Sequence, residues 1–390
     1  MKHPEQIRVI EGLMSHLDHD TNVDAGHMLK NPVSSYLCPE IASREWQDFF
    51  QSHPQVIGLS GDLPENESFF TSNDLGKPIL CTRASDGSFH AFLNVCRHRG
   101  TIVEEEERGC KRRFPCPFHA WTYDSKGQLV GLPKEDHFGA VDRASLALTE
   151  LPAVEKYGLL FVAPQPGADF DVDTLLGDLA PELESWGLDR YAHQGNHRYD
   201  HAMNWKFAID TFGETYHFSS LHRNTLAQVF YGNAQMYDRY GRNHRMALCI
   251  KTIDELRTKP RSEWDILDAA LPVYYLFPNI QLLIGRGGPT LVRVYPNGPD
   301  PHQSFSQVSF YLDPELPQGE ARDMVLLRME TFAQIIRDED YVAAASQHRG
   351  ATSEAQEFVL FGRNEPALHH YHDTYRAALG LQPLERIEPA

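Results

Sequence analysis

Two pairs of metal-binding residue types constrain this chain more than any other feature. Cys96 and His98 form the first pair, Cys116 and His119 form the second, and 17 residues separate His98 from Cys116. Each pair follows a run of β-type residues, so two loops that leave strands could hold a metal centre between them. Thiolate suits soft or borderline metals and imidazole suits iron or zinc, so a Cys₂His₂ set is chemically coherent. The spacing by itself leaves iron–sulfur and zinc chemistry open.

The residues around these pairs resemble the Rieske [2Fe-2S] signature. The matching segments are Cys96-x-His98-Arg99-Gly100 and Cys116-Pro117-x-His119-x-Trp121. The resemblance implies that the two cysteines hold one iron and the two histidines hold the other, which raises the reduction potential above that of an all-cysteine cluster. It also implies that Trp121 lies against the cluster. Zinc is the alternative for the same ligands, but the ββα zinc finger carries both of its histidines on one helix.

The other cysteines lack a matching histidine arrangement. Six cysteines in 390 residues are too few for a disulfide framework. We therefore expect buried or incidental thiols at Cys38, Cys81, Cys110 and Cys249.

A second group of candidate ligands follows the motif Asn204-Trp205-Lys206. The pattern predicts a helix from Trp205 to about Leu221. On such a helix Asp210, Glu214 and His217 fall within a narrow arc of one face, because successive residues are about 100° apart.

His222 follows at a spacing that a continuous helix cannot use. It would lie about 140° from His217 on an ideal helix, so both can bind one metal only if the helix unwinds or ends near Phe218-Ser219-Ser220. The order Asn-Trp-Lys, an acid, then Tyr-His-x₄-His is similar to that in the catalytic domain of the Rieske non-haem iron oxygenases. The resemblance implies a mononuclear Fe(II) held by His217, His222 and one later carboxylate, with positions left open for O₂.

The third iron ligand is expected in a long helix that we predict from about Gln318 to Gln347. The stretch Arg337-Asp338-Glu339-Asp340-Tyr341 resembles the family's Glu-Asp segment. We predict Asp340 as the ligand, with Asp338 as the alternative. A solvated acidic stretch is the competing interpretation.

The resemblance also implies a role for Glu214, three positions before His217. In the family an acid at this position bridges the Rieske histidine of one subunit to an iron-ligand histidine of its neighbour, within a head-to-tail homotrimer. Most members have Asp here, and Glu resembles the branch that oxidises quaternary amines such as carnitine or glycine betaine. Asp210 is a weaker candidate for the same network. Candidate substrate-contacting residues flank the ligands at Phe212, Phe218 and Leu221.

The order of β-type and helical segments along the chain predicts an α+β protein with an N-terminal arm followed by two domains. Short β-type runs with turn signals extend from about Gln55 to Pro164, where Pro164-Gln165-Pro166-Gly167 reads as a boundary. We predict an arm over residues 1–54 that packs on the catalytic domain, a small all-β Rieske domain over 55–165, and an α+β catalytic domain over 166–390. For the last, we expect a helix over 173–186 and strands between 273 and 312. The resemblance implies a central antiparallel sheet of the helix-grip, START-like type.

Charge and hydropathy exclude several classes of partner. Lys and Arg number 36 against 54 Asp and Glu, a formal net charge of −18, which repels phosphate backbones and anionic membranes. No apolar stretch is long enough to span a bilayer, and the first 30 residues contain no signal-peptide core. We therefore expect a cytoplasmic protein that binds neither nucleic acid nor membrane.

Two metal centres on one chain imply the terminal oxygenase of a multi-component system. Electrons would pass from a separate flavin or iron–sulfur reductase, or a ferredoxin, through the [2Fe-2S] cluster to the Fe(II), where O₂ is activated. The substrate would be a small aromatic, alicyclic or quaternary-amine molecule that is mono- or cis-dihydroxylated or demethylated. No G-x-G-x-x-G motif is present, so NAD(P)H should act only through the partner. The alternatives are a non-catalytic Rieske electron carrier and a zinc-binding structural protein.

Overall fold

The computed structural model describes residues 1–388 and divides the chain into two compact units. The smaller unit comprises Gln47–Leu175 and Gly187–His193. The larger unit comprises Met1–Trp46, Leu176–Trp186 and the chain from Gln194 onward. Residues 47–54, which we expected in the arm, thus group with the smaller unit, as do residues 166–175 and 187–193, which we expected in the catalytic domain.

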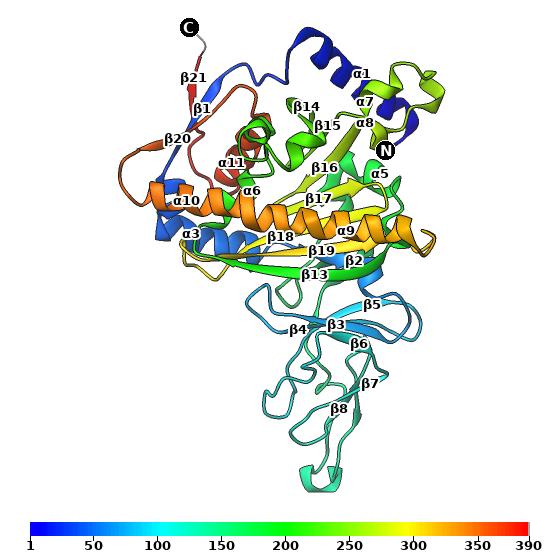
Figure 1. The fold of residues 1–390 in the computed structure, drawn as a ribbon. Coiled ribbons are helices and arrows are strands. Elements are labelled where there is room, and N and C mark those ends of the chain that lie inside the picture. The colour runs from blue at the N-terminus through cyan, green and yellow to red at the C-terminus, as the bar shows by residue number, and fades with distance from the viewer. Residues whose placement is uncertain (389–390) are drawn as a thin grey trace. The chain divides into compact units, whose positions relative to one another are not determined.

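The smaller unit is built from three antiparallel sheets of short strands (Figure 1). The strand orders are β10-β5-β4-β3-β6, β11-β12-β2 and β7-β8-β9. The strands are β2 (Gln55–Leu59), β3 (Ser68–Ser72), β4 (Ile79–Arg83), β5 (Phe89–Leu93), β6 (Arg108–Cys110), β7 (Arg113–Pro115), β8 (Thr122–Asp124), β9 (Leu129–Gly131), β10 (Glu150–Leu151), β11 (Ala153–Lys156) and β12 (Leu159–Val162). One core cluster joins Phe69, Leu80 and Phe92 to Cys96 and Cys116, so the core forms directly beneath the two cysteine loops.

The larger unit is organised around a seven-stranded sheet in the order β13-β19-β18-β17-β16-β15-β14. Its strands are β13 (Ala192–His201), β14 (Phe230–Tyr240), β15 (Asn243–Ile250), β16 (Ala270–Leu276), β17 (Ile280–Gly285), β18 (Gly288–Pro296) and β19 (Ser304–Leu312). The pairings from β14 to β19 are antiparallel. The predicted strands between 273 and 312 and the antiparallel sheet are therefore confirmed.

The turn between β17 and β18 requires glycine. Gly288 has φ of +150°, and a Cβ built on it would lie 2.0 Å from the backbone oxygen of Tyr311 on the neighbouring strand. Only a residue without a side chain permits that close approach.

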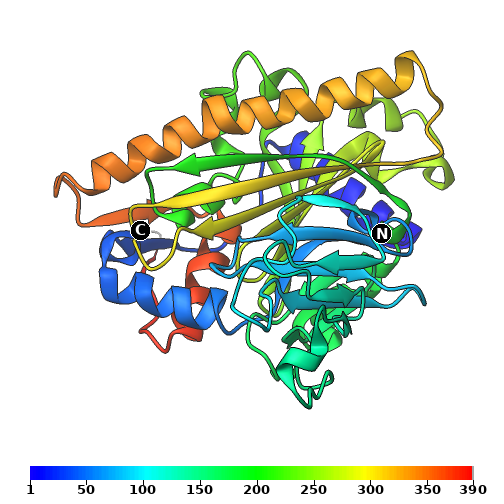
Figure 2. The ribbon, with the colours of Figure 1, turned by 90° about the horizontal axis from the view of Figure 1, so that it is seen from below.

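A long helical stretch runs across one face of this sheet, drawn in orange in Figures 1 and 2. It comprises α9 (Glu320–Ile335), the π-helical turn η9 (Ile336–Asp340) and α10 (Tyr341–Ala351). The predicted helix over 318–347 is present, but a wider turn interrupts it. The chain then forms β20 (Phe358–Phe361), α11 (Pro366–Ala378) and β21 (Glu385–Ile387), and β1 (Met28–Pro32) pairs with both of these strands.

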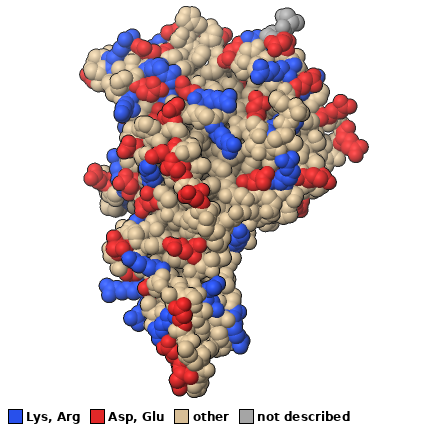
Figure 3. Space-filling model, turned by 180° about the vertical axis from the view of Figure 1, so that it is seen from behind, with Lys and Arg blue, Asp and Glu red and all other residues tan. Residues whose placement is uncertain are grey.

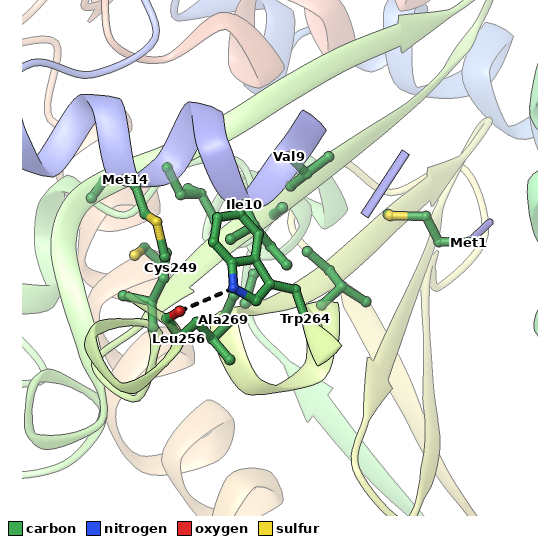
Figure 4. Close-up of a cluster of buried hydrophobic side chains, with 14 residues drawn as sticks. Met1, Val9, Ile10, Met14, Cys249, Leu256, Trp264 and Ala269 are labelled. Atoms are coloured by element: carbon green, nitrogen blue, oxygen red, sulfur yellow. Dashed lines mark hydrogen bonds between the residues drawn. The ribbon is translucent and has the colours of Figure 1, made fainter. Parts of the chain in front are cut away.

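The N-terminal segment, which we predicted as an arm, begins with one long helix, α1 (His3–His19). Val9, Ile10 and Leu13 are fully buried, because their spacing places them on one side of the helix. They pack in a cluster with Trp264 and Leu256 (Figure 4). The indole N–H of Trp264 donates to the carbonyl of Leu256 at 3.0 Å, which satisfies the one polar atom of this side chain.

Shorter helices fill the connections. The predicted helix over 173–186 is wrong in extent: α4 (Val172–Leu176), a 3₁₀ turn η4 (Gly177–Leu179) and α5 (Ala180–Glu184) replace it, since Gly177 adopts a left-handed φ of +54°. The remaining α-helices are α2 (Ser34–Leu37), α3 (Pro39–Glu45), α6 (Trp205–Asp210), α7 (Ile253–Leu256) and α8 (Ile266–Ala269). The remaining π or 3₁₀ turns are η1 (Trp46–Phe50), η2 (Ser60–Asp62), η3 (Glu135–Phe138), η5 (Leu188–Arg190), η6 (Tyr216–Ser219), η7 (Leu226–Gln228) and η8 (Arg261–Glu263).

These elements confirm the α+β class, with one mainly β unit and one mixed unit. Among residues 1–388, no helix has both the length and the apolar character that a membrane span requires. Basic and acidic side chains are interspersed over the face drawn in Figure 3, so the negative charge of the chain does not gather into one patch there.

Candidate metal centres and active site

Both cysteine–histidine pairs lie on loops of the same construction in the smaller unit. In the first loop the N–H of Cys96 donates to Thr101 at 2.8 Å, and the N–H of Gly100 donates back to Cys96 at 3.0 Å. The second loop repeats both bonds 20 positions later, at 2.8 and 2.9 Å, starting from Cys116. Gly100 and Ala120 turn their loops with φ of +80° and +57°. Each cysteine is buried while its loop curls around it.

The histidines of the two loops face each other. The ring centroids of His98 and His119 are 4.7 Å apart, and Trp121 stacks on His98 at 4.8 Å with an interplanar angle of 9°. The Nδ1 atom of His98 is buried and has no hydrogen-bond partner among the described residues. A buried nitrogen lone pair without a partner is costly unless a metal takes it. The four side chains therefore fit a Rieske cluster.

A tyrosine hydroxyl lies beside one of the cysteines. The Tyr123 oxygen accepts the backbone N–H of Arg97 at 2.9 Å, so its own O–H is free to donate to the Cys96 sulfur at 3.4 Å. Burial and this contact raise the pKa of Tyr123, which keeps the hydroxyl protonated. Hydrogen bonds to cluster sulfurs raise the reduction potential, and the sequence alone offered no signal for this residue.

The motif Asn204-Trp205-Lys206 has a structural explanation. The side chain of Asn204 caps helix α6 by accepting the N–H of Lys206 at 3.0 Å. The indole N–H of Trp205 and the ammonium of Lys206 both bind the carboxylate of Glu45, at 3.0 and 2.6 Å. This pair is almost fully buried, so it fixes the start of α6 against the N-terminal segment.

The helix that we predicted over 205–221 ends at Asp210. At Gly213 a Cβ would lie 2.5 Å from Leu368 and 2.8 Å from Tyr371, so the chain passes close to α11 instead of continuing as a helix. His217 then lies in the 3₁₀ turn η6, and its ring centroid is 4.9 Å from that of His222. The helix therefore ends earlier than the break near Phe218-Ser219-Ser220 that we expected, and Asp210, Glu214 and His217 do not share one face of a helix.

Three side chains from two distant segments converge at this point. Oδ1 of Asp340 lies 3.0 Å from Nε2 of His222 and 3.5 Å from Nε2 of His217. One ligand atom from each residue can be chosen so that all three lie within 4.8 Å of one another. Nε2 of His217 is buried and has no hydrogen-bond partner within the described part of the chain. The donor set fits a single iron with open positions.

The alternative ligand Asp338 is excluded from this cluster by its position. Its carboxylate is exposed and pairs with the neighbouring Arg337 at 2.6 Å. Asp340 is buried, because η9 turns it toward the sheet.

The pKa values of these side chains indicate that they share protons, and a bound metal would take the place of those protons. Burial lowers the pKa of His217, but its contacts with Asp340 and Glu214 outweigh burial and raise that pKa to about 9. Burial raises the pKa of Asp340, but both imidazoles outweigh it and the net shift is downward. Metal binding at this cluster therefore releases protons, as expected for imidazole ligands.

Glu214 and Asp210 have different surroundings. Glu214 accepts the backbone N–H of His217 at 3.1 Å, and its other oxygen contacts Nδ1 of the same histidine. Asp210 instead accepts the hydroxyl of Tyr36 at 2.7 Å and lies 2.9 Å from Nε2 of His372. Of the two acids, only Glu214 is in hydrogen-bond contact with the candidate ligand His217.

Two cavities reach the candidate iron ligands. The larger, of about 450 Å³, is lined by Glu214, Asp210, Glu365, His217 and Asp340 among others, and none of its lining residues is Lys or Arg. Leu221 lines this cavity.

The smaller cavity, of about 40 Å³, touches all three candidate ligands. Its wall is mostly apolar and includes four phenylalanines, Phe212, Phe218, Phe230 and Phe332. Phe212 and Phe218, which we predicted to contact substrate, thus line a cavity that also touches the three candidate ligands.

Glu365 is a titratable group of the larger cavity that the sequence did not reveal. Burial raises its pKa to about 7 against the effect of the Gly362 N–H, and the carboxylates of Glu214 and Asp210 add to the rise while His217 opposes it. A carboxyl group with this pKa is protonated in part at neutral pH.

The pKa of Glu365 is raised in the folded state but not in the unfolded state. As the pH rises from about 4.5 to about 7, the free energy of unfolding of the wild type should therefore fall relative to that of Glu365→Gln. The folded state binds more protons in this window. We expect the difference in the free energy of unfolding to change by about 3 kcal/mol over this window. Urea unfolding of both iron-free proteins at several pH values measures it, and parallel pH curves would contradict the assignment.

Two family models match the chain. The model described as "Rieske [2Fe-2S] domain" matches residues 53–155, and the model described as "Ring hydroxylating alpha subunit (catalytic domain)" matches residues 188–381. The chain belongs to the Rieske-type ring-hydroxylating alpha subunits. The two matched domains imply that this alpha subunit carries a Rieske [2Fe-2S] cluster and a mononuclear iron.

Relatives of this alpha subunit differ in substrate. It is 29% identical over 202 residues to the glycine betaine monooxygenase oxygenase subunit of Chromohalobacter salexigens. This match covers 51% of this chain and 44% of that protein. It is 26% identical over 352 residues to the chloroplastic choline monooxygenase of Spinacia oleracea, covering 87% of this chain and 76% of that one. Its match to the first of these therefore spans less than half of the relative's own length.

Solved structures share the fold of this alpha subunit. The quaternary ammonium Rieske monooxygenase CntA in complex with L-carnitine superimposes with a TM-score of 0.76 at 18% identity, covering 92% of this chain and 97% of that one. Naphthalene 1,2-dioxygenase with indole bound gives a TM-score of 0.70 at 17% identity, covering 92% and 94%.

Proposed function

We propose that this chain is the terminal oxygenase of a multi-component system that adds oxygen from O₂ to a small organic substrate. The observation that carries the proposal is the convergence of His217, His222 and Asp340 in a chain that also holds the two cysteine–histidine loops. A bound [2Fe-2S] cluster would supply single electrons and a bound Fe(II) would activate O₂. A degenerate second domain, as in a plain electron carrier, would not keep three ligands together.

We assign the cluster ligands to Cys96, His98, Cys116 and His119, and the iron ligands to His217, His222 and Asp340. His98 and His217 each offer a buried nitrogen without a hydrogen bond among residues 1–388. We propose the ranges 55–165 and 166–390 for the two domains, with residues 1–54 as the arm. The electron donor would be a separate reductase or ferredoxin, and the location would be the cytoplasm.

We propose a head-to-tail homotrimer in which Glu214 bridges to the Rieske histidine of a neighbour. Two exposed apolar regions support this arrangement. In the smaller unit, Phe118 and Phe138 are 51% and 46% exposed close to the His98–His119 pair. In the larger unit, Leu360 is 50% exposed on the wall of the cavity that contains Glu214. In a closed head-to-tail ring, the apolar region of the smaller unit of one chain would be covered by the apolar region of the larger unit of the next chain.

We propose that the substrate is a quaternary amine. The larger cavity carries several carboxylates and no Lys or Arg, which favours a cation and disfavours an aromatic acid. The phenylalanine rings of the smaller cavity can face a trimethylammonium group, since aromatic faces attract such cations. Relatives named for glycine betaine, choline and carnitine agree with this charge.

The substrate proposal is tested by O₂ uptake with a generic reductase. Choline is compared with 3,3-dimethyl-1-butanol, which has the same shape without the charge, and benzoate and naphthalene complete the panel. We expect product-coupled O₂ uptake with the cation only. Coupled uptake with the neutral isostere or an aromatic compound, and none with any quaternary amine, would overturn the substrate class while leaving the oxygenase assignment intact.

A further inference from the structure

One of the proposed iron ligands is held on both sides by neighbouring acids. Nε2 of His222 lies 3.0 Å from Oδ1 of Asp340, and Nδ1 of the same ring lies 2.7 Å from Oε2 of Glu339. The His222 side chain is fully buried, whereas that of Glu339 is 25% exposed. The two ring nitrogens therefore have carboxylates that come from consecutive residues.

The π-helical turn η9 makes this arrangement possible. In a regular α-helix, consecutive side chains diverge by about 100°. Glu339 and Asp340 are the last two residues of η9 (Ile336–Asp340), where the backbone is wider, and π turns inside α-helices are frequent at functional sites. The longer Glu side chain reaches the far edge of the ring while the shorter Asp faces the near edge.

A threonine holds Glu339 in place. The hydroxyl of Thr225 donates to Oε2 of Glu339 at 2.9 Å, the same oxygen that faces His222. The backbone N–H of Thr225 donates to the carbonyl of His222 at 3.0 Å. These contacts link Glu339, His222 and Thr225 in a closed cycle. The carboxylate, the imidazole and the backbone at Thr225 therefore hold one another in place.

We propose that Glu339 is a positioning residue for the metal ligand His222. Its carboxylate keeps the proton on Nδ1, which leaves the lone pair of Nε2 directed toward the metal site, and it makes the imidazole a stronger donor. Glu214 has the corresponding place at His217, with one oxygen on Nδ1 of that ring. The inference rests on the proposed ligand set, and it adds that each histidine ligand has its own carboxylate.

The test measures metal affinity in the full-length protein with its Rieske cluster intact. The mononuclear site is emptied by chelation and titrated anaerobically with Fe(II), and the EPR spectrum of the nitric oxide adduct reports the ligand field. The variants are Glu339→Ala, Glu339→Gln and Thr225→Val. Asp338→Asn is the matched control, because that acid is adjacent and exposed and pairs with Arg337 rather than with His222.

We expect Glu339→Ala to weaken Fe(II) binding roughly 10- to 100-fold and to alter the rhombicity of the nitric oxide signal. Glu339→Gln should lose less, since its amide oxygen still accepts the Nδ1 proton, and Thr225→Val should lose least. Asp338→Asn should match the wild type.

A loss of less than about threefold in Glu339→Ala, with an unchanged EPR signal, would overturn the proposal. If that variant does not fold, the same threshold applies to Glu339→Leu, which keeps the bulk of the side chain but offers no hydrogen-bond acceptor to Nδ1. A wild type that binds no Fe(II) would instead overturn the ligand set itself.

Discussion

Replacing His217 with alanine should abolish O₂-dependent turnover and leave the Rieske spectrum unchanged. The side chain supplies one of three proposed ligand atoms, and two remaining ligands cannot hold a single iron firmly. We expect activity to fall by at least roughly 10³-fold, which corresponds to about 4 kcal/mol of activation free energy.

Metal analysis and EPR of the reduced protein decide this prediction. The wild type should contain about three iron atoms and two acid-labile sulfides per chain, and His217→Ala should lose only one iron. His19→Ala is the control, since this exposed histidine lies on α1 and its ring hydrogen-bonds with Ser15 of the same helix. Loss of the cluster spectrum together with activity would show that the site is misplaced.

The substitution Glu214→Gln should leave both metal centres occupied and slow turnover sharply. Gln has the same length and keeps an acceptor for the N–H of His217, but it removes the charge beside Nδ1. We expect a loss of roughly 10²-fold, about 2.7 kcal/mol. The rate at which substrate and O₂ reoxidise the reduced cluster measures the proposed inter-subunit step directly.

Glu214→Asp serves as the conservative comparison for this experiment. It retains the charge, so it should recover part of the reoxidation rate that Glu214→Gln loses. Unchanged reoxidation in Glu214→Gln, with normal iron content, would remove the bridging role and leave Glu214 with its local hydrogen bonds alone.

Sequence reasoning worked best where the chemistry lies within a few residues. The two cysteine–histidine pairs can be predicted because each occupies one short loop, and the structure brings the rings of His98 and His119 together in an edge-to-face arrangement. His217 and His222 are also close in sequence, and their spacing alone predicted that a continuous helix could not bring both to one metal. The helix ends at Asp210, however, and the close approach of Gly213 to α11 just beyond it is a long-range contact that no local pattern indicates.

Contacts over long sequence distances were harder to anticipate. The choice between Asp340 and Asp338 depended on a π turn, and neither propensity nor periodicity marks such a turn. Glu339 and Glu365 looked like ordinary surface acids, since their partners lie more than a hundred residues away or across a cavity. The long helix α1 was also underestimated, because its apolar stripe gains its stability from packing on distant residues.

The packing of α1 sets a limit on how this protein can be shortened. Met14 lies in the same cluster as Cys249 of β15 (Figure 4), and Leu13 and Ala247 of β15 belong to this cluster as well. A fragment that starts beyond the first twenty residues would therefore expose an apolar face of the sheet to water. Such surfaces promote self-association. Anyone who wishes to express the iron-binding half alone must therefore carry this helix along, although it lies far from the metal ligands in the sequence and contributes none of them.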